Sequence, residues 1–179
     1  GYERGFIQTT KLCKMITDQQ IKMIFLSSGG TVYGNQEIKP ITEDALPRPI
    51  NHYGNVKLCI ENTIRTFNYQ AHTKILIARI SNPYGPGQDF NKGVGFIDAA
   101  IKKTIRSEKI EIWGDGNNVR DYIYIDDVCR MLISLFYYQE DYDTFNISSN
   151  TGTSQRDVIQ MLEAMQLAPQ VEYLPARSV

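Results

Sequence analysis

Apolar and polar residues follow two different periods along the chain. Phe6, Cys13 and Ile16 recur at helical spacing, which predicts a helix over 3–19. The short run 22–26, apolar after its first residue, is typical of a buried parallel strand. The alternation between these two patterns continues to the end of the chain.

The same patterns predict the remaining elements. Helices are expected over 52–70, 96–107, 126–138 and 154–166, strands over 74–80, 110–113, 122–125, 144–148 and 171–174, and loops over 29–49 and 83–95. Ser154, followed three residues later by Asp157, predicts a capping box at the last helix. Within 126–138 the inward side chains are expected to be Cys129, Leu132, Ile133 and Phe136. Strands alternating with helices indicate an α/β fold with a parallel sheet.

Composition narrows the class of protein. A chain of 179 residues can form a domain with a core, and a net charge of −1 argues against nucleic-acid or anionic-membrane partners. The three cysteines, Cys13, Cys59 and Cys129, form no CxxC pair, so a zinc site is not expected. We expect them to be reduced thiols of a cytoplasmic protein. No apolar run approaches the roughly 20 residues of a membrane span.

Tyr53 and Lys57 carry the most informative spacing. Residues four apart share one face of a helix. A lysine ammonium beside a phenol favours the phenolate, which predicts an acid/base for an alcohol or sugar hydroxyl. The alternative is a solvated Tyr–Lys pair on an exposed helix face.

The order of motifs around this pair resembles a known family. Apolar 25–26 leads into Ser27-Ser28-Gly29-Gly30-Thr31-Val32-Tyr33-Gly34 before Tyr53, and 78–87, 113–116, 120–128 and 145–148 follow it. This order resembles the extended short-chain dehydrogenase/reductase family of nucleotide-sugar epimerases and dehydratases, in particular its UDP-sugar 4-epimerase branch. The resemblance implies NAD as cofactor, a nucleotide sugar as substrate, and a homodimer through the helices near 3–19 and 53–70. It also suggests a role in polysaccharide biosynthesis.

The resemblance also predicts how the chain divides. Residues 1–82 and about 120–150 would form a partial Rossmann-like parallel sheet, and about 83–119 and 151–179 part of a small substrate-binding α/β subdomain. The glycine-rich turn that holds the NAD pyrophosphate in this family is not found in the sequence. We therefore expect an internal piece of a longer enzyme, which alone binds NAD weakly or not at all and turns over no substrate.

Site residues follow from the resemblance position by position. Tyr53 would be the catalytic base and Lys57 would assist it, and both would bind the cofactor together with Ser27 and Pro83. The nucleotide sugar would be contacted by Asn82, Val94, Trp113, Arg120 and Arg177. Alternatives remain at three of these positions: a turn for Asn82, core packing for Trp113, and a salt bridge from Arg120 to Asp121, Asp126 or Asp127.

One position departs from the family pattern. The family usually has Ser or Thr where this chain has Gly29, so Thr31, or else Ser28, would supply the missing hydroxyl. The structural alternative is that Gly29-Gly30 permits an unusual backbone turn. The absence of a carboxylate here also argues against a dehydratase. A decarboxylase, a keto-sugar reductase and a non-catalytic sugar-nucleotide-binding module remain the other hypotheses.

Overall fold

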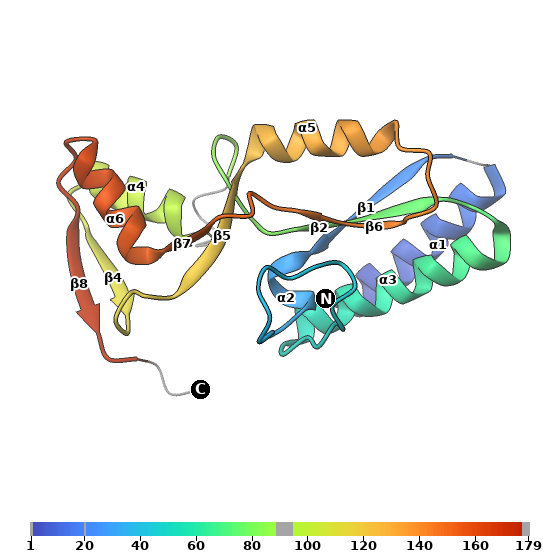
Figure 1. Ribbon diagram of the computed structural model, residues 1–179, viewed down its shortest axis with the longest axis horizontal. Helices are drawn as coiled ribbons and strands as arrows, with labels where there is room; N and C mark the ends of the chain where they lie inside the picture. The colour runs from blue at the N-terminus through green and yellow to red at the C-terminus, as the bar shows by residue number, and fades with distance from the viewer. Residues whose placement is uncertain (1, 20, 89–94, 177–179) are drawn as a thin grey trace. The chain divides into compact units, whose positions relative to one another are not determined.

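The computed structural model describes residues 2–19, 21–88 and 95–176, which form two compact units. Unit 1 comprises Gly1–Ser81 and Asp126–Ile147, and unit 2 comprises Asn82–Ile125 and Ser148–Val179. The chain therefore leaves unit 1 after β2, builds most of unit 2, and returns for one more helix and strand (Figure 1). In the part of the chain that the structure describes, no helix combines the length and apolarity needed to cross a bilayer.

A parallel sheet is the centre of unit 1. Its strands are β1 (Met23–Ser28), β2 (Ile75–Ile80) and β6 (Thr144–Ile147), in the order β1-β2-β6. The middle strand is nearly continuous in buried aliphatic residues, as a parallel strand covered on both faces should be. Arg79 interrupts that run, and it lies level with Ser27 on β1 and Asn146 on β6.

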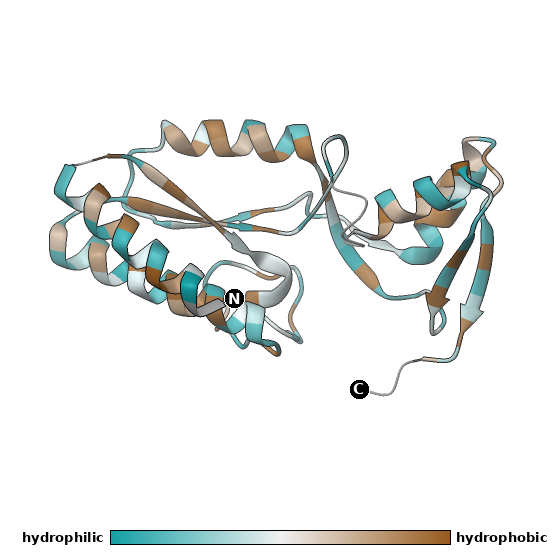
Figure 2. Ribbon diagram, turned by 180° about the vertical axis from the view of Figure 1, so that it is seen from behind, coloured by the Kyte–Doolittle hydropathy of each residue, from teal (hydrophilic) through white to brown (hydrophobic). Residues whose placement is uncertain are grey.

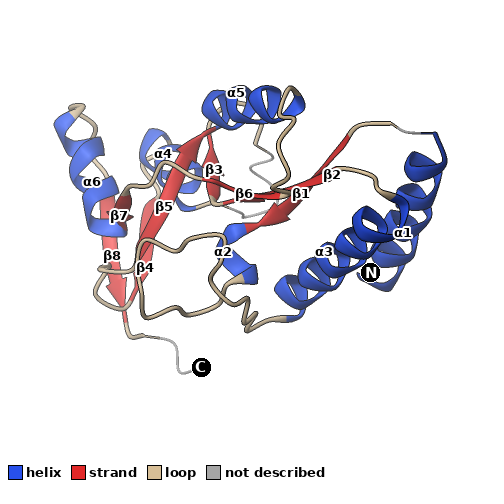
Figure 3. Ribbon diagram, turned by 45° about the vertical axis from the view of Figure 1, so that its right-hand side comes forward, coloured by secondary structure: helices blue, strands red, loops and turns tan. Residues whose placement is uncertain are grey.

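Helices cover both faces of this sheet. α1 (Tyr2–Gln19) and α3 (His52–Ala71) lie side by side on one face, and α5 (Ile125–Phe136) lies on the other (Figures 1 and 3). In Figure 2, α1 and α3 change between brown and teal along their length, as amphipathic helices do. The core between them and the sheet consists of Cys13, Ile16, Ile60, Ile64, Ile75 and Ile77.

Two details of unit 1 differ from expectation. The expected loop over 29–49 opens with a helical turn, α2 (Gly29–Val32). On α5 the buried residues are Val128 and Leu135, whereas three of the four expected inward side chains, Cys129, Ile133 and Phe136, are exposed. The prediction was wrong because the apolar face of α5 is about half of its circumference and wider than the stripe that the sheet buries, so periodicity alone does not single out that stripe.

Unit 2 contains two small sheets and two helices. β3 (Asn82–Tyr84), β5 (Val119–Tyr124) and β7 (Gly152–Ser154) form one sheet, and β4 (Lys109–Trp113) with β8 (Gln170–Leu174) forms the other. β3 overlaps the start of the loop expected over 83–95, and no strand was predicted where β7 lies. α4 (Phe96–Ile105) and α6 (Gln155–Ala164) pack with β4 around Ala100, Ile110, Ile112, Ile159 and Leu162.

The predicted capping box begins α6. The Ser154 hydroxyl accepts a hydrogen bond from the Asp157 backbone N–H, and the Asp157 carboxylate accepts one from the Ser154 N–H. These two bonds satisfy donors that would otherwise be unpaired at the first turn of the helix. The helix thus starts where the sequence signal predicts.

Candidate functional site

The first turn of α3 presents Tyr53. The Asn51 side chain caps the helix by accepting a hydrogen bond from the Gly54 N–H at 2.8 Å. The cap ends the extended segment at Asn51 and starts the helix one residue before Tyr53. Tyr53 is 41% exposed, while its neighbour Gly54 is buried. The phenol therefore lies at a helix end with one side open to solvent.

Lys57 lies one turn further along α3. Its Nζ donates a hydrogen bond to the Leu26 carbonyl at 2.8 Å and lies 5.6 Å from the centre of the Tyr53 ring and 4.8 Å from that of Phe25. Burial lowers the pKa of Lys57, and the negative charge of Glu61 opposes that shift. The structure thus brings together the two residues that the helical spacing had paired.

Thr31 and Ser28 are the two hydroxyls that could stand in for a side chain at position 29. Thr31 lies in α2, and among the described residues its buried Oγ1 has no hydrogen-bond partner. A Cβ on Gly54 would lie 2.5 Å from the Thr31 carbonyl oxygen, so α2 packs directly against α3 beside Tyr53. Ser28 precedes α2 but its side chain does not cap that turn. Neither hydroxyl therefore stabilises the α2 turn by a side-chain hydrogen bond.

Gly29 has a packing reason for its missing side chain. It lies in the helical turn α2, and a Cβ there would lie 3.2 Å from the Arg79 carbonyl oxygen and 3.5 Å from that of Ile80. The positive-φ glycines of the described chain do not include Gly29 or Gly30. Close approach to β2, rather than an unusual turn, therefore accounts for glycine at position 29.

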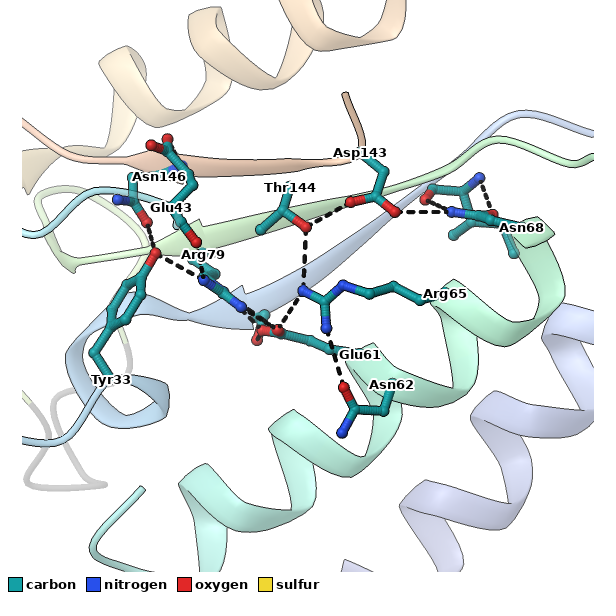
Figure 4. A network of polar contacts seen from close by, with 12 residues as sticks. Tyr33, Glu43, Glu61, Asn62, Arg65, Asn68, Arg79, Asp143, Thr144 and Asn146 are labelled. Carbon is teal, nitrogen blue, oxygen red and sulfur yellow. Dashed lines mark hydrogen bonds and ion pairs between the residues drawn. The ribbon is translucent and has the colours of Figure 1, made fainter. Parts of the chain in front are cut away.

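Ser27 joins a buried polar network with Glu61, Arg79 and Tyr33. Figure 4 shows the last three of these residues. The Ser27 hydroxyl donates to the Glu61 carboxylate at 2.5 Å, and Glu61 also accepts hydrogen bonds from Arg79, the shortest at 2.7 Å. Arg79 in turn donates to the Tyr33 hydroxyl at 2.8 Å. Sequence reasoning did not single out Glu61 or Arg79. The available signals were an acid four residues after Lys57 and a charged residue inside an otherwise apolar strand.

A pocket of about 240 Å³ lies within unit 2. Three of the predicted site residues line it: Asn82 and Pro83 on β3 and Arg120 on β5. The rest of its lining is Tyr84, Gly95, Phe96, Ile97, Asn118, Tyr122 and Gln155. Pairing of β3 with β5, and packing of the α6 start against β5 through β7, gather these distant segments.

The electrostatics of this pocket suit an anion. The α4 N-terminus borders it through Gly95, Phe96 and Ile97, and a helix N-terminus presents unpaired N–H groups and a partial positive charge. Arg120 donates to the Asn118 side chain at 2.7 Å and to the Val119 carbonyl.

These contacts orient the Arg120 guanidinium without a carboxylate. Within the described ranges, no ion pair joins Arg120 to Asp121, Asp126 or Asp127, so the salt bridge considered as an alternative is wrong. The charge of Arg120 remains available to an anion.

Asn82 and Tyr122 complete the polar lining. The Asn82 side chain donates to the Asp121 carbonyl at 2.8 Å, which ties it to β5 and leaves its amide oxygen as an acceptor. Burial raises the pKa of Tyr122, and the positive charge of Arg120 opposes the shift. Tyr122 thus stays a neutral hydrogen-bonding group in the physiological pH range.

The remaining predicted residues lie elsewhere. Trp113 ends β4 and is 43% exposed, on the opposite face from the buried Ile112, so core packing does not explain it. It does not line the pocket described above. Val94 and Arg177 lie outside the described residues.

Comparisons with known proteins agree with this arrangement. The chain is 36% identical over 142 residues to the dTDP-4-dehydro-6-deoxyglucose reductase of Escherichia coli, covering 79% of this chain and 45% of the relative. Its fold matches UDP-glucose 4-epimerase of Thermotoga maritima, solved with UDP-glucose, with a TM-score of 0.87 and 32% identity over 95% of this chain and 56% of the other. UDP-glucose 4-epimerase of Thermus thermophilus, solved with NAD, matches with a TM-score of 0.83 and 26% identity over 94% and 56% of the two chains.

The chain spans about half the length of these relatives. The model of the NAD dependent epimerase/dehydratase family matches residues 2–148, which is most of the chain. The family resemblance of the motifs, the α/β fold and NAD as the cofactor of the family are all confirmed. This chain belongs to the NAD dependent epimerase/dehydratase family.

Proposed function

We propose that the protein containing this chain epimerises a nucleotide sugar, a UDP-hexose or UDP-N-acetylhexosamine, at its C4 hydroxyl. The observation that carries the proposal is the placement of Lys57 Nζ beside the ring of a partly exposed Tyr53. An anion-suited pocket containing Arg120, in unit 2, supports a phosphorylated substrate. Solved relatives named as UDP-glucose 4-epimerases support the choice of reaction.

Each residue of the pair has a step in that reaction. Tyr53 Oη takes the proton of the C4 hydroxyl as the carbon is oxidised to a ketone, and returns it after the sugar has presented its other face. The positive Lys57 ammonium stabilises the phenolate that Tyr53 carries before it takes the proton and again after it returns it. Thr31 supplies a second hydrogen bond to the reacting hydroxyl, which its buried, unpartnered Oγ1 supports. The net reaction is redox-neutral.

NAD fits the Tyr53–Lys57 end of this arrangement. When bound, NAD accepts the C4 hydride and gives it back to the opposite face. The Lys57 ammonium has three N–H donors and gives one to Leu26, so the others can hold ribose hydroxyls. The Ser27 hydroxyl donates to Glu61, so it can bind cofactor only as an acceptor. Pro83 remains a proposed cofactor contact on β3.

A keto-sugar reductase is the second candidate. Support comes from the 36% identical relative, which is named a dTDP-4-dehydro-6-deoxyglucose reductase. Such an enzyme transfers hydride once, to a sugar that arrives already as a ketone. Tyr53 would then act as the acid that protonates the new hydroxyl. The two reactions share the same residues and differ in whether reduced cofactor is consumed.

The test is a substrate panel with cofactor accounting. The full-length protein containing this chain is supplied with UDP-galactose, with UDP-N-acetylgalactosamine, and with a dTDP-4-keto-6-deoxy sugar plus reduced nicotinamide cofactor. Epimerisation predicts the C4 epimer of a UDP sugar with no net change in nicotinamide absorbance. Loss of that absorbance with the keto sugar alone would replace epimerisation by reduction. UDP binding without turnover of any of the three would favour a binding module.

We also propose a homodimer through α1 and α3. Ile7, Leu12 and Met15 on α1 are between 45% and 59% exposed, which supports an apolar contact surface. Sedimentation of the chain at several concentrations tests the dimer.

A cytoplasmic location and a role in polysaccharide biosynthesis remain predictions. Cys13, Cys59 and Cys129 form no disulfide, which supports a reducing compartment.

A further inference from the structure

Glu61 occupies a position to which the proposed reaction gives no role. It is fully buried on α3, four residues after Lys57 and eight after Tyr53, so the three side chains follow one face of the helix. A buried carboxylate is costly unless its oxygens are paired and hydrogen-bonded. Its contacts therefore indicate what it holds in place.

Those contacts fix α3 against β1. Glu61 accepts the hydroxyl of Ser27, and Lys57 donates to the carbonyl of Leu26, the residue before it. Two successive residues of β1 are thus bonded to two successive turns of the same helix face. These two bonds fix the position of both side chains, Glu61 and Lys57, along β1.

Arg79 extends this set of contacts to α2. Its guanidinium donates to both Glu61 oxygens, and its Nη1 donates to Tyr33 Oη, which in turn donates to Asn146 Oδ1 at 2.7 Å (Figure 4). Tyr33 is 3% exposed and caps the C-terminus of α2, the turn that contains Thr31. Arg65 adds a longer ion pair to Glu61, 3.2 Å, from a partly exposed side chain.

We propose that Glu61 is a positioning residue for the Tyr53–Lys57 pair: its carboxylate, bonded to Ser27, holds α3 in register with β1 and so places the Lys57 ammonium at Leu26, while Arg79 transmits the same constraint to the Thr31 turn. This inference rests on the proposed function, which makes Tyr53 and Lys57 the reacting pair. It predicts that the titration midpoint of Lys57 changes when Glu61 is replaced. The midpoint should not change in a variant that only destabilises the fold.

The charges around Lys57 make Glu61 the group to test. β1 and α2 carry no ionisable side chain, and β2 carries only Arg79. On α3 the ionisable residues within eight positions of Lys57 are His52, Tyr53, Cys59, Glu61 and Arg65. α1 packs on α3 through Cys13 and Ile16 and also carries Glu3, Arg4, Lys11, Lys14 and Asp18. Glu61 is the charge that offsets the effect of burial on Lys57.

The experiment is an NMR titration of Lys57 in this chain with isotopically labelled lysine, without cofactor or substrate. The Lys57 signal is assigned by its loss in Lys57→Met. In Glu61→Gln the Lys57 midpoint is expected to move to lower pH, with the other lysines unmoved. If Glu61→Gln does not fold, Glu61→Gln combined with Arg79→Met removes the buried pair together; the loss of the Arg79 cation opposes the loss of the Glu61 anion, so a smaller shift of the Lys57 midpoint to lower pH is expected.

Tyr33→Phe is the matched control. It breaks two hydrogen bonds of the same network without changing a charge near Lys57, so it should destabilise the chain and leave the Lys57 midpoint in place. An unchanged midpoint in the Glu61 variants, or an equal shift in Tyr33→Phe, would overturn the inference. Because no turnover is measured, the result is independent of whether the protein proves to be an epimerase.

Discussion

At the scale of single residues, burial decides which side chains are committed to structure and which remain for chemistry. Glu61 and Arg79 are almost completely buried and saturate one another with hydrogen bonds. Tyr53, two turns away, keeps part of its ring in solvent. The sequence identified Tyr53 and Lys57 because helical spacing is local. It could not identify Glu61 and Arg79 as partners because they meet only through the pairing of β1 with β2 and the packing of α3.

The buried phenol of Tyr33 predicts a pH dependence of stability. Burial raises the pKa of Tyr33 above 10.0, so the folded chain holds a proton that the unfolded chain releases. This contribution is complete below the ordinary phenol pKa and is lost as the pH rises through the folded value. Urea unfolding from neutral pH to above pH 10 should therefore show a steeper loss in wild type than in Tyr33→Phe. Tyr122 titrates in both proteins and its contribution cancels. Burial raises the pKa of Tyr142 in both, and Tyr33 adds to that rise only in wild type, which acts in the same direction. Parallel curves would contradict the assignment.

At the scale of elements, contacts between α2 and α3 decide how the reacting pair is presented. The sequence predicted α3 well, since its apolar stripe is a local signal, and the Asn51 cap that the structure adds is local too. It missed α2, a single turn that depends on packing against Gly54 rather than on periodicity. It also misjudged the buried face of α5, where the sheet rather than the pattern selects Val128 and Leu135.

Two helical glycines give a matched test of that packing. Gly54→Ala places a Cβ 2.5 Å from the Thr31 carbonyl and 3.0 Å from Pro49, so we expect a loss of about 1–3 kcal/mol in the free energy of unfolding. Gly5→Ala in α1 meets nothing within 4 Å and should gain about 0.5–1 kcal/mol. Chemical denaturation of both variants measures the difference. If Gly54→Ala raised the free energy of unfolding as much as Gly5→Ala does, α2 would have to move away from α3 at no cost, and the packing argument would be wrong.

At the scale of the whole molecule, the chain divides its chemistry between two units. The Tyr53–Lys57 pair lies in unit 1, and the Arg120 pocket is formed entirely within unit 2. The sequence predicted most strands and helices and the α/β class. The family resemblance grouped about 83–119 with 151–179, but the pattern of residues did not show the pocket or the place of β5 beside it, because β3 and β7 are three residues each and their pairing with β5 is non-local.

Pocket charge rather than net charge should govern substrate binding. Because the chain carries a net charge of −1, its overall field does not attract a diphosphate. Arg120→Gln should therefore weaken UDP binding by about tenfold or more and reduce its salt dependence. Arg106→Gln, at an exposed position in the same unit, is the control and should change little. Titration calorimetry at two salt concentrations measures UDP binding by both variants. If both variants lost the same affinity for UDP, the diphosphate would not bind at Arg120.

The measurement that tests the central claim most directly compares two tyrosines of the same helix. In the full-length protein, C4 epimerisation of the accepted UDP sugar is measured for Tyr53→Phe and for Tyr69→Phe, which changes an exposed residue of α3 far from Lys57. We expect Tyr53→Phe to lose roughly 100-fold or more of kcat with unchanged stability, because a phenylalanine can neither take nor return the hydroxyl proton. Tyr69→Phe should retain full activity. Equal activity in the two variants would show that Tyr53 is not the acid/base.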